Sequence, residues 1–251
     1  MARKYGWVRD TPDHRDIPFV VSEERAVLPP VWDMTAAQPP VYDQGNEGSC
    51  VGNGCSGRFD FQRKLQGLPF MTPSRQFVYY NARRIEGTTK SDSGAQIRDG
   101  IKALAKYGVC PETEWPYLST NMTKKPTAKV YKDALKNIVV QYQSVAQDLN
   151  TMKACLAGNS PIVIGFSVYE SFESDEVAKT GIAPLPGKNE QLLGGHCVEI
   201  VGFSDPKQVW ICRNSWGTSW GNKGYFTLPY SYLTNPKLSG DFWTLVKVNA
   251  V

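Results

Sequence analysis

Long apolar runs and strong charge are both missing from this sequence of 251 residues. No run of about 18 apolar residues is present, so a transmembrane helix is not expected. The net charge is only +4, from 28 basic and 24 acidic residues, and no basic run of five occurs. This balance gives no reason to expect binding to nucleic acid or to a membrane surface. The composition, 41% hydrophobic and 21% charged, is typical of globular domains.

Export signals are also missing, and histidine is scarce. Two basic residues near Met1 are not followed by an apolar segment, so the N-terminus does not look like a signal peptide. We therefore expect a cytoplasmic or otherwise intracellular protein with six reduced cysteines, and leave secretion by a non-standard route open. One of the two histidines, His14, has no partner at metal-ligand spacing and is expected on the surface.

A glycine-rich turn over residues 44–50 leads into a segment with apolar residues at helical spacing. Cys50 is thereby placed in the first turn of a helix, where unpaired backbone N–H groups and the helix dipole favour a thiolate. We expect a lowered pKa and a nucleophilic sulfur at Cys50. The amide of Gln44, folded back across the turn, is expected to donate to an oxyanion. Taken alone, this stretch fits a buried structural cysteine equally well.

Hydrophobic periodicity divides the rest of the chain into a helical and a strand-rich part. Helices are predicted from Cys50 onward and over residues 72–85, 97–108 and 148–158. Strands are predicted over residues 138–140, 161–166, 196–203, 209–213, 225–228 and 242–248, and a long loop over 171–195. Thr72 and Pro73 are expected as the N-cap and first residue of their helix. Helices followed by strands indicate an α+β fold with two facing lobes.

Residues 1–27 alternate charges with prolines and follow neither the helical nor the strand period. Such a segment is expected to lie extended over the surface, with Trp7, Ile17 and Phe19 as anchors. Whether it regulates a binding groove or only covers apolar surface stays open at this point. Residues 28–43, which are broken by prolines, can form only short edge strands or irregular chain.

A candidate general base is His196, which follows two glycines at the start of a predicted strand. The partner strand of the predicted hairpin ends at Asn214, so residues near 197 should lie opposite residues near 214. Asn214 is then placed to hold the second ring nitrogen of His196 and to fix the tautomer that faces Cys50. Trp216 is expected to shield that bond from water. Singly, His196 and Asn214 fit a core histidine and a turn residue, but with Cys50 they favour a catalytic site.

Together these motifs resemble those of the papain and cathepsin-like cysteine peptidases. The resemblance rests on Gln44 with Gly48-Ser49-Cys50, on His196 located 146 residues after the cysteine, and on Asn214-Ser215-Trp216-Gly217. It covers roughly residues 28–251.

Several positions depart from the family pattern. Glu47 stands where secreted members usually have a disulfide cysteine, and Val51 stands where tryptophan is usual. The Cys-Asn-Gly-Gly segment of the family is reduced to Ser91-Asp92-Ser93-Gly94. These departures make the usual disulfides unexpected. They agree with a microbial or viral type in which residues 1–27 form an extension or short propeptide.

The resemblance implies a papain-like fold, with a helical left lobe, an antiparallel β-barrel-like right lobe and the active-site cleft between them. The helical lobe is expected over about 44–135 and the β-rich lobe over about 136–251 with 28–43. It further implies that substrate is bound by Gly48, Ser49, Gly94, Gly165, Gly195, Trp216, Asp241 and Phe242. Gly165 and Gly195 fall where the family lines its main specificity pocket, so that pocket should be wide.

The implied function is that of a cysteine endopeptidase made as a zymogen. Cys50 would form an acyl-enzyme, Gln44 would hold the oxyanion, and His196 with Asn214 would transfer protons, without metal or cofactor. Expected partners are a peptide or protein substrate and, in the cleft, a protein inhibitor or the chain's own N-terminal segment; a monomer is expected. Two other classes stay open: another Cys-His acyl-transfer enzyme, isopeptidase or transglutaminase-like, and a catalytically silent binding protein.

Overall fold

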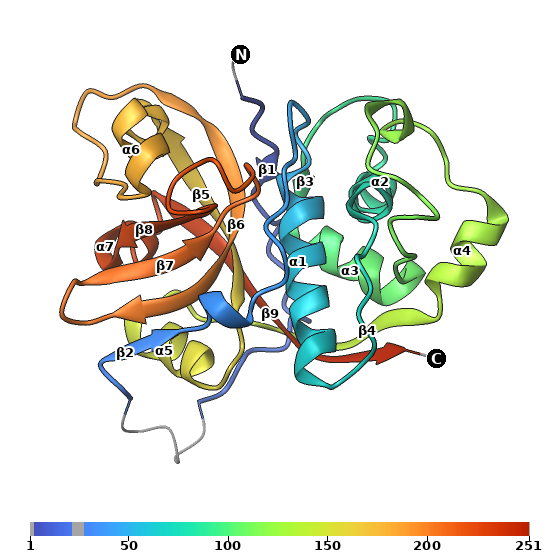
Figure 1. Ribbon diagram of the computed structural model, residues 1–251, viewed down its shortest axis with the longest axis horizontal. Coiled ribbons are helices and arrows are strands. Elements are labelled where there is room, and N and C mark those ends of the chain that lie inside the picture. The colour runs from blue at the N-terminus through green and yellow to red at the C-terminus, as the bar shows by residue number, and fades with distance from the viewer. Residues whose placement is uncertain (1–2, 22–27, 251) are drawn as a thin grey trace.

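The computed structural model, which describes residues 3–21 and 28–250, has two lobes side by side (Figure 1). One lobe is mainly helical and the other is built on a curved sheet, with helix α1 between them. The described helices are α1 (Cys50–Leu65), α2 (Arg75–Glu86), α3 (Ile97–Tyr107), α4 (Ala128–Ala134), α5 (Leu149–Ala157), α6 (Asp175–Thr180) and α7 (Tyr230–Leu233). Short 3-10 turns occupy Thr35–Ala37, Ser119–Asn121 and Glu170–Glu173.

The main sheet has seven strands, in the order β4-β9-β5-β6-β7-β8 with β2 paired to β6. Its strands are β2 (Val31–Asp33), β4 (Asn137–Ser144), β5 (Ile162–Tyr169), β6 (Leu192–Ser204), β7 (Val209–Arg213), β8 (Tyr225–Pro229) and β9 (Ser239–Ala250). All these pairings are antiparallel. Among the described residues β4 and β8 do not pair, so the sheet is open and not a closed barrel.

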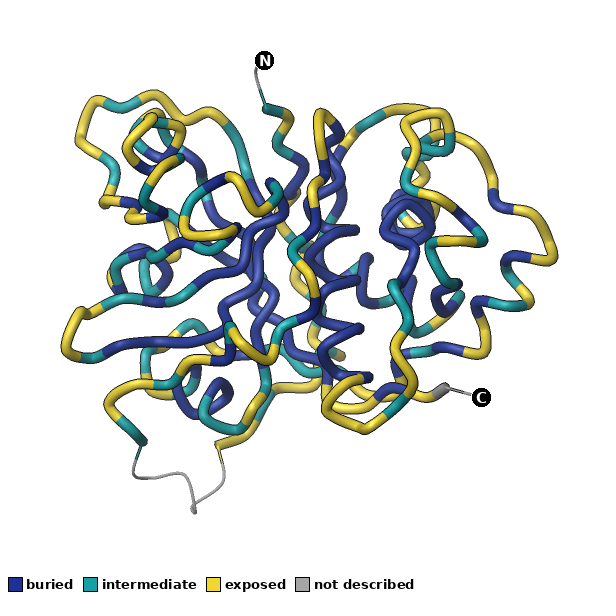
Figure 2. Tube along the Cα trace, viewed as in Figure 1, coloured by how far each residue is buried: buried dark blue, intermediate teal, exposed yellow. Residues whose placement is uncertain are grey.

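Helix α1 is the central element of the molecule. Its residues from Cys50 through Arg63 are all buried (Figure 2). Its glycines allow this close packing, because a Cβ at Gly52 would lie 2.7 Å from the Tyr79 side chain of α2. On the side facing the sheet, a Cβ at Gly57 would overlap the buried Glu199–Arg213 ion pair, whose charged atoms are 2.9 Å apart. The helix therefore contacts both lobes through positions that only glycine can occupy without rearrangement.

Two predictions about element boundaries are wrong. Helix α2 begins at Arg75 with Ser74 as its N-cap, and the Ser74 hydroxyl accepts from the Phe77 N–H at 3.1 Å, so Thr72 and Pro73 lie outside. The predicted loop 171–195 contains helix α6 and the first residues of β6. A helix of six residues is too short to show a period, although it has a serine N-cap, Ser174. The predicted cap of α5 is confirmed, since Asp148 accepts from the Thr151 N–H at 2.9 Å.

The N-terminal segment runs along both lobes. Strand β1 (Trp7–Val8) pairs in parallel with β3 (Ala95–Gln96) of the helical lobe. Further on, the Phe19 N–H bonds to the Ser144 carbonyl of β4 at 2.7 Å. Trp7 is buried as expected, but Ile17 is 59% exposed and is not an anchor. Residues 22–27 of the predicted extension lie outside the described part.

Two negative findings concern the described residues. None of their helices is long and apolar enough to cross a membrane. All six cysteines fall within the described ranges, all are buried, and no disulfide joins any of them.

Candidate active site

Cys50 is the first residue of α1, as predicted, and its side chain is fully buried. Burial raises the pKa of the thiol to about 11, although the backbone N–H groups of Cys197 and Gly6 act in the opposite direction. The expected lowering is therefore wrong for this form of the protein, because loss of hydration outweighs the helix N-terminus. The Cys197 N–H contacts the Cys50 sulfur, and Cys197 directly follows His196 in the chain.

His196 and Asn214 are joined by a hydrogen bond of 2.8 Å between Nε2 and Oδ1. Trp216 stacks on the imidazole, with ring centroids 4.7 Å apart and planes inclined by 24°. Strands β6 and β7 pair Glu199 with Arg213, and this register differs by one residue from the predicted one. The other ring nitrogen, Nδ1, is buried without a hydrogen-bond partner among the described residues. The arrangement fixes one tautomer and leaves Nδ1 for a reacting group.

Burial disfavours the charged form of the imidazole as well. Burial lowers the pKa of His196 to about 4, the bond to Asn214 opposes that change, and the positive charge of Arg3 adds to it. In both groups, burial thus opposes the charged form that the ion pair of a cysteine nucleophile needs.

Gln44 lies in the turn before α1. Its side chain links this turn to the turn that follows Asn214. Its Oε1 accepts from the Ser215 hydroxyl at 2.6 Å, and its Nε2 donates to the Glu47 carbonyl at 2.8 Å. An amide nitrogen carries two N–H groups, so one remains for an oxyanion. Gln44 is 1% exposed and is held on both sides.

The N-terminal segment covers this site. Gly6 lies between Gly48 and Gly94, and its carbonyl accepts from the Ala95 N–H at 2.8 Å. A Cβ added at Gly6 would overlap the Gly48 carbonyl. Only glycine fits at position 6, and the chain before and after it closes over Cys50.

The residues on either side of Gly6 complete the cover. The Tyr5 side chain lies over Gly194 and its hydroxyl donates to Glu173. The Arg3 guanidinium lies 3.9 Å from the centroid of the Trp216 ring. The Trp7 indole fills the space in front of Gly165, so the predicted specificity pocket is occupied by this chain itself.

Six of the eight predicted binding residues contact this segment. Contacts are made at Gly48, Gly94, Gly165, Gly195, Trp216 and Asp241. Phe242 instead packs in the core of the β lobe with 5% exposure, and the Ser49 hydroxyl bonds to Tyr117. Sequence reasoning missed Tyr5 and Gly6; a glycine between two aromatic residues was the available signal.

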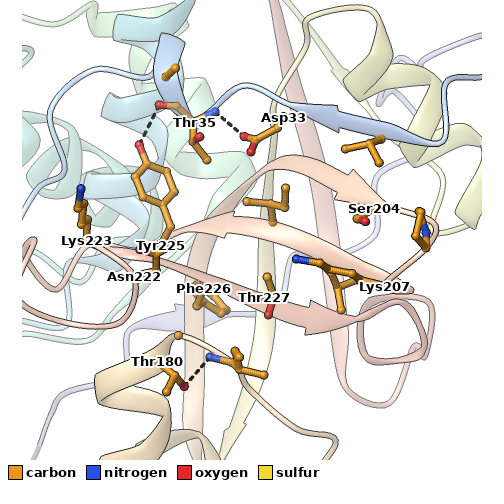
Figure 3. A pocket seen from close by; sticks show the side chains of 17 residues that line it. Asp33, Thr35, Thr180, Ser204, Lys207, Asn222, Lys223, Tyr225, Phe226 and Thr227 are labelled. Atoms are coloured by element: carbon orange, nitrogen blue, oxygen red, sulfur yellow. Dashed lines mark hydrogen bonds between the residues drawn. The ribbon is translucent and has the colours of Figure 1, made fainter.

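A large cavity lies away from these residues. It has a volume of about 1060 Å³ and lies in the β lobe among β2, β7, β8 and the end of α6 (Figure 3). The Tyr225 hydroxyl reaches the Thr35 carbonyl at 3.5 Å across one end of it. None of the predicted site residues lines it. Among the described residues no cluster of His, Cys, Asp and Glu is placed to hold a metal ion.

Comparison with known proteins agrees with this geometry. Residues 28–235 match the model of the papain family of cysteine proteases, and the chain belongs to that family. It is therefore a hydrolase, a cysteine endopeptidase with a papain-like fold.

The relatives include microbial and viral proteins. The crystal structure of xylellain, a cysteine protease from Xylella fastidiosa, is 44% identical with a TM-score of 0.92, over 100% of this chain and 98% of that one. A peptidase C1-like protein of Acanthamoeba polyphaga mimivirus, described as uncharacterized, is 35% identical over 99% of this chain and 88% of its own length. Cathepsin K of Gallus gallus is 27% identical over 78% of this chain and 57% of its own.

Proposed function

We propose that Cys50, His196, Asn214 and Gln44 carry out peptide hydrolysis in a form whose cleft is open. Exposure to water would lower the pKa of the thiol and raise that of the imidazole, so that the proton passes from Cys50 to His196. The thiolate attacks the peptide carbonyl, and Gln44 with the Cys50 N–H stabilises the oxyanion. His196 protonates the leaving amine and then activates water to release the acyl group.

The observation that carries this assignment is the 2.8 Å bond between His196 and Asn214, beneath Trp216 and next to the helix that begins at Cys50. An asparagine third member argues against a transglutaminase-like or isopeptidase site, which usually has aspartate. A complete set of nucleophile, base and orienting residue argues against a silent binding protein.

Hydrolysis of short fluorogenic peptide amides tests the assignment. The opened protein should release the fluorophore, and a thiol-directed epoxide should block release. Cys50→Ala should abolish turnover with an unchanged melting temperature, because the site otherwise packs as before. Turnover by the folded Cys50→Ala protein would refute the role of the cysteine.

We also propose that the N-terminal segment keeps the chain as a zymogen, with peptides or proteins as substrates of an intracellular, monomeric enzyme. Burial of Cys50 under Gly6 and filling of the pocket by Trp7 support an inhibitory role. A chain that begins at Leu28 should be more active per folded molecule, and a peptide of residues 1–27 should inhibit it. Loss of stability without a gain in activity would make the segment a structural arm.

A further inference from the structure

A carboxylate outside the set of predicted site residues holds the turn before Cys50. All six cysteines lie in the described ranges and none is in a disulfide, so this turn has no covalent tie to a distant part of the chain. Asp92, in the loop between α2 and β3, supplies a polar tie instead. The Gly48 N–H donates to both of its oxygens, at 3.1 Å each. A Cβ at Gly48 would lie 3.1 Å from Oδ1, so the carboxylate also packs against the Gly48 backbone.

Tyr79 of α2 extends this tie to a second backbone group. Its hydroxyl donates to Asp92 Oδ1 at 2.7 Å and accepts from the Gly94 N–H at 3.0 Å. The Tyr79 side chain is buried, and burial raises the pKa of its phenol, so the hydroxyl stays protonated and can donate. Asp92 and Tyr79 together therefore hold Gly48 and Gly94 at a fixed separation.

The separation of Gly48 from Gly94 sets the width of the cleft beside Cys50. Gly6 of the N-terminal segment occupies this space. A Cβ on Gly6 would overlap the Gly48 carbonyl, and one on Gly94 would overlap the Gly6 carbonyl. A substrate backbone that replaces the segment would lie between the same two glycines.

The turn that contains Gly48 also carries the groups expected to bind the oxyanion. Its first residue, Gln44, is fixed at the β lobe, where its N–H donates to the Ser215 carbonyl at 2.9 Å. The Tyr117 hydroxyl supports the Gln44 carbonyl at 2.9 Å. Gly48 stands two residues before Cys50, and its N–H is held by Asp92. A shift of Gly48 would therefore move the Cys50 N–H relative to the carbonyl under attack.

The carboxylate keeps its main partners when the N-terminal segment leaves. Burial acts to raise the pKa of Asp92, but hydrogen bonds from Tyr79 and Gly48 and the charge of Lys4 hold it below its usual value. Lys4 lies 3.1 Å from Oδ2 with a side chain that is 59% exposed, and it would depart with the segment. The bonds from Gly48 and Tyr79 come from the body of the protein and would remain in the open form.

We propose that Asp92 is a positioning residue that, through Gly48 and Tyr79, holds the turn with the oxyanion donors in place; this inference rests on the proposed peptidase site. Asp92 touches no reacting atom, so its loss should reduce the rate of the chemical step more than the affinity for substrate. A neutral acceptor of the same shape is sufficient, because Oδ1 alone receives both the Gly48 N–H and the Tyr79 hydroxyl.

The full chain with Gly6→Ala is the parent for the test, so that loss of the Lys4 ion pair does not itself open the cleft. Active sites are counted with the thiol-directed epoxide. Asp92→Ala should lower kcat about 10- to 100-fold with little change in KM, the effect of a misplacement of about 1 Å. Asp92→Asn should restore most of kcat, because its carbonyl accepts both hydrogen bonds.

A matched control is Asp133→Ala. Asp133 lies on α4 at the outer edge of the helical lobe (Figure 1) and pairs with Lys129 at 2.9 Å and Lys136 at 2.7 Å. Its removal should leave kcat unchanged.

A double substitution tests whether Asp92 acts through Tyr79. Tyr79→Phe removes the hydroxyl that joins Asp92 to Gly94 and should lower kcat as well. Adding it to Asp92→Ala should cause little further loss, because residues that act in one network are not additive. Losses that multiply fully would overturn the link through Tyr79.

Hydrogen exchange provides a measurement that does not need hydrolysis. The Gly48 amide should exchange faster in Asp92→Ala than in the parent, and at the parent's rate in Asp92→Asn and Asp133→Ala. An unchanged kcat in Asp92→Ala, even with a lower melting temperature, overturns the inference, while turnover by the parent leaves the peptidase assignment intact. A parent that the epoxide labels but that hydrolyses no peptide overturns the peptidase assignment. Faster exchange at Gly48 in Asp92→Ala would then still support the tie that Asp92 makes.

Discussion

At the scale of single residues, environment decides what the catalytic groups do. Cys50 stands at a helix N-terminus that favours the thiolate, yet full burial raises its pKa to about 11. Burial also holds the pKa of His196 at about 4. The same residues in a hydrated cleft would regain values that allow an ion pair. In the closed form both groups are covered, and burial disfavours the charged form of each.

Substitutions at Gln44 and Asn214 should separate their two roles. Gln44→Ala should lower kcat about 10²–10³-fold, the usual effect of losing one oxyanion donor. Asn214→Ala should weaken activity without abolishing it, because it removes an orienting residue and no reacting group. Steady-state kinetics of an opened chain measures both. A Gln44→Ala effect confined to KM would contradict the oxyanion role.

We expect Asp10 to make the binding of the N-terminal segment over the cleft depend on pH. Burial first, and then the charge of Asp241, raises its pKa from 3.8 to about 7, while hydrogen bonds from the Trp243 indole and the Arg98 N–H oppose the change. Glu86 of α2 also acts on Asp10 through space. If Asp10 has its ordinary pKa in the open form, the closed form binds the extra proton. Its contribution to closure is then complete below the ordinary pKa and is lost as pH rises through about 7.

Asp10→Asn tests this linkage, because asparagine resembles the protonated acid. The wild-type full chain and the variant should have similar activity near pH 4, whereas the wild type should be at least about tenfold more active near pH 8. The titration of His196 affects the rates of both proteins alike, so it cancels in the ratio of the two rates. A ratio that stays constant with pH would exclude Asp10 as the titrating group.

At the scale of elements, we expect the two-residue pairing of β1 with β3 to control access to the cleft. It brings Gly6 against Gly48, where no side chain fits. Gly6→Ala should therefore displace the segment and raise the activity of the full chain. Val8→Ala is the matched control, because the Val8 side chain is 43% exposed and only its backbone takes part in the pairing. Fluorogenic assays of both variants measure the effect; equal activities would mean that the segment does not block the site.

At the scale of the whole molecule, the lobes are joined across α1. The Glu199–Arg213 pair is almost fully buried beneath Gly57 of that helix. Removing one member of a buried pair leaves the other charge without compensation. Glu199→Ala should lower the free energy of unfolding by about 3–5 kcal/mol. Thermal melting measures this, with Glu176→Ala on exposed α6 as a control expected within about 0.5 kcal/mol of wild type.

Much of the fold and site could be predicted because the signals are local. The turn before Cys50, the glycines before His196 and the sequence around Asn214 each act over a few residues. Short helix α6 escaped prediction because six residues do not show a period. Phe242 was expected at the groove, but the alternation of β9 directs it into the core.

The sequence by itself determined the class of protein, since nucleophile, base and orienting residue are identified by their types, order and spacing. Only the tertiary structure decided whether the site is open or covered. Burial of Cys50 depends on Gly6 meeting Gly48 and Gly94, and the filling of the pocket depends on Trp7 meeting Asp241, 234 residues away. Such contacts depend on how strands from distant parts of the chain come together, which no local pattern encodes. The direction of the pKa of Cys50 follows from that packing and not from its helix alone.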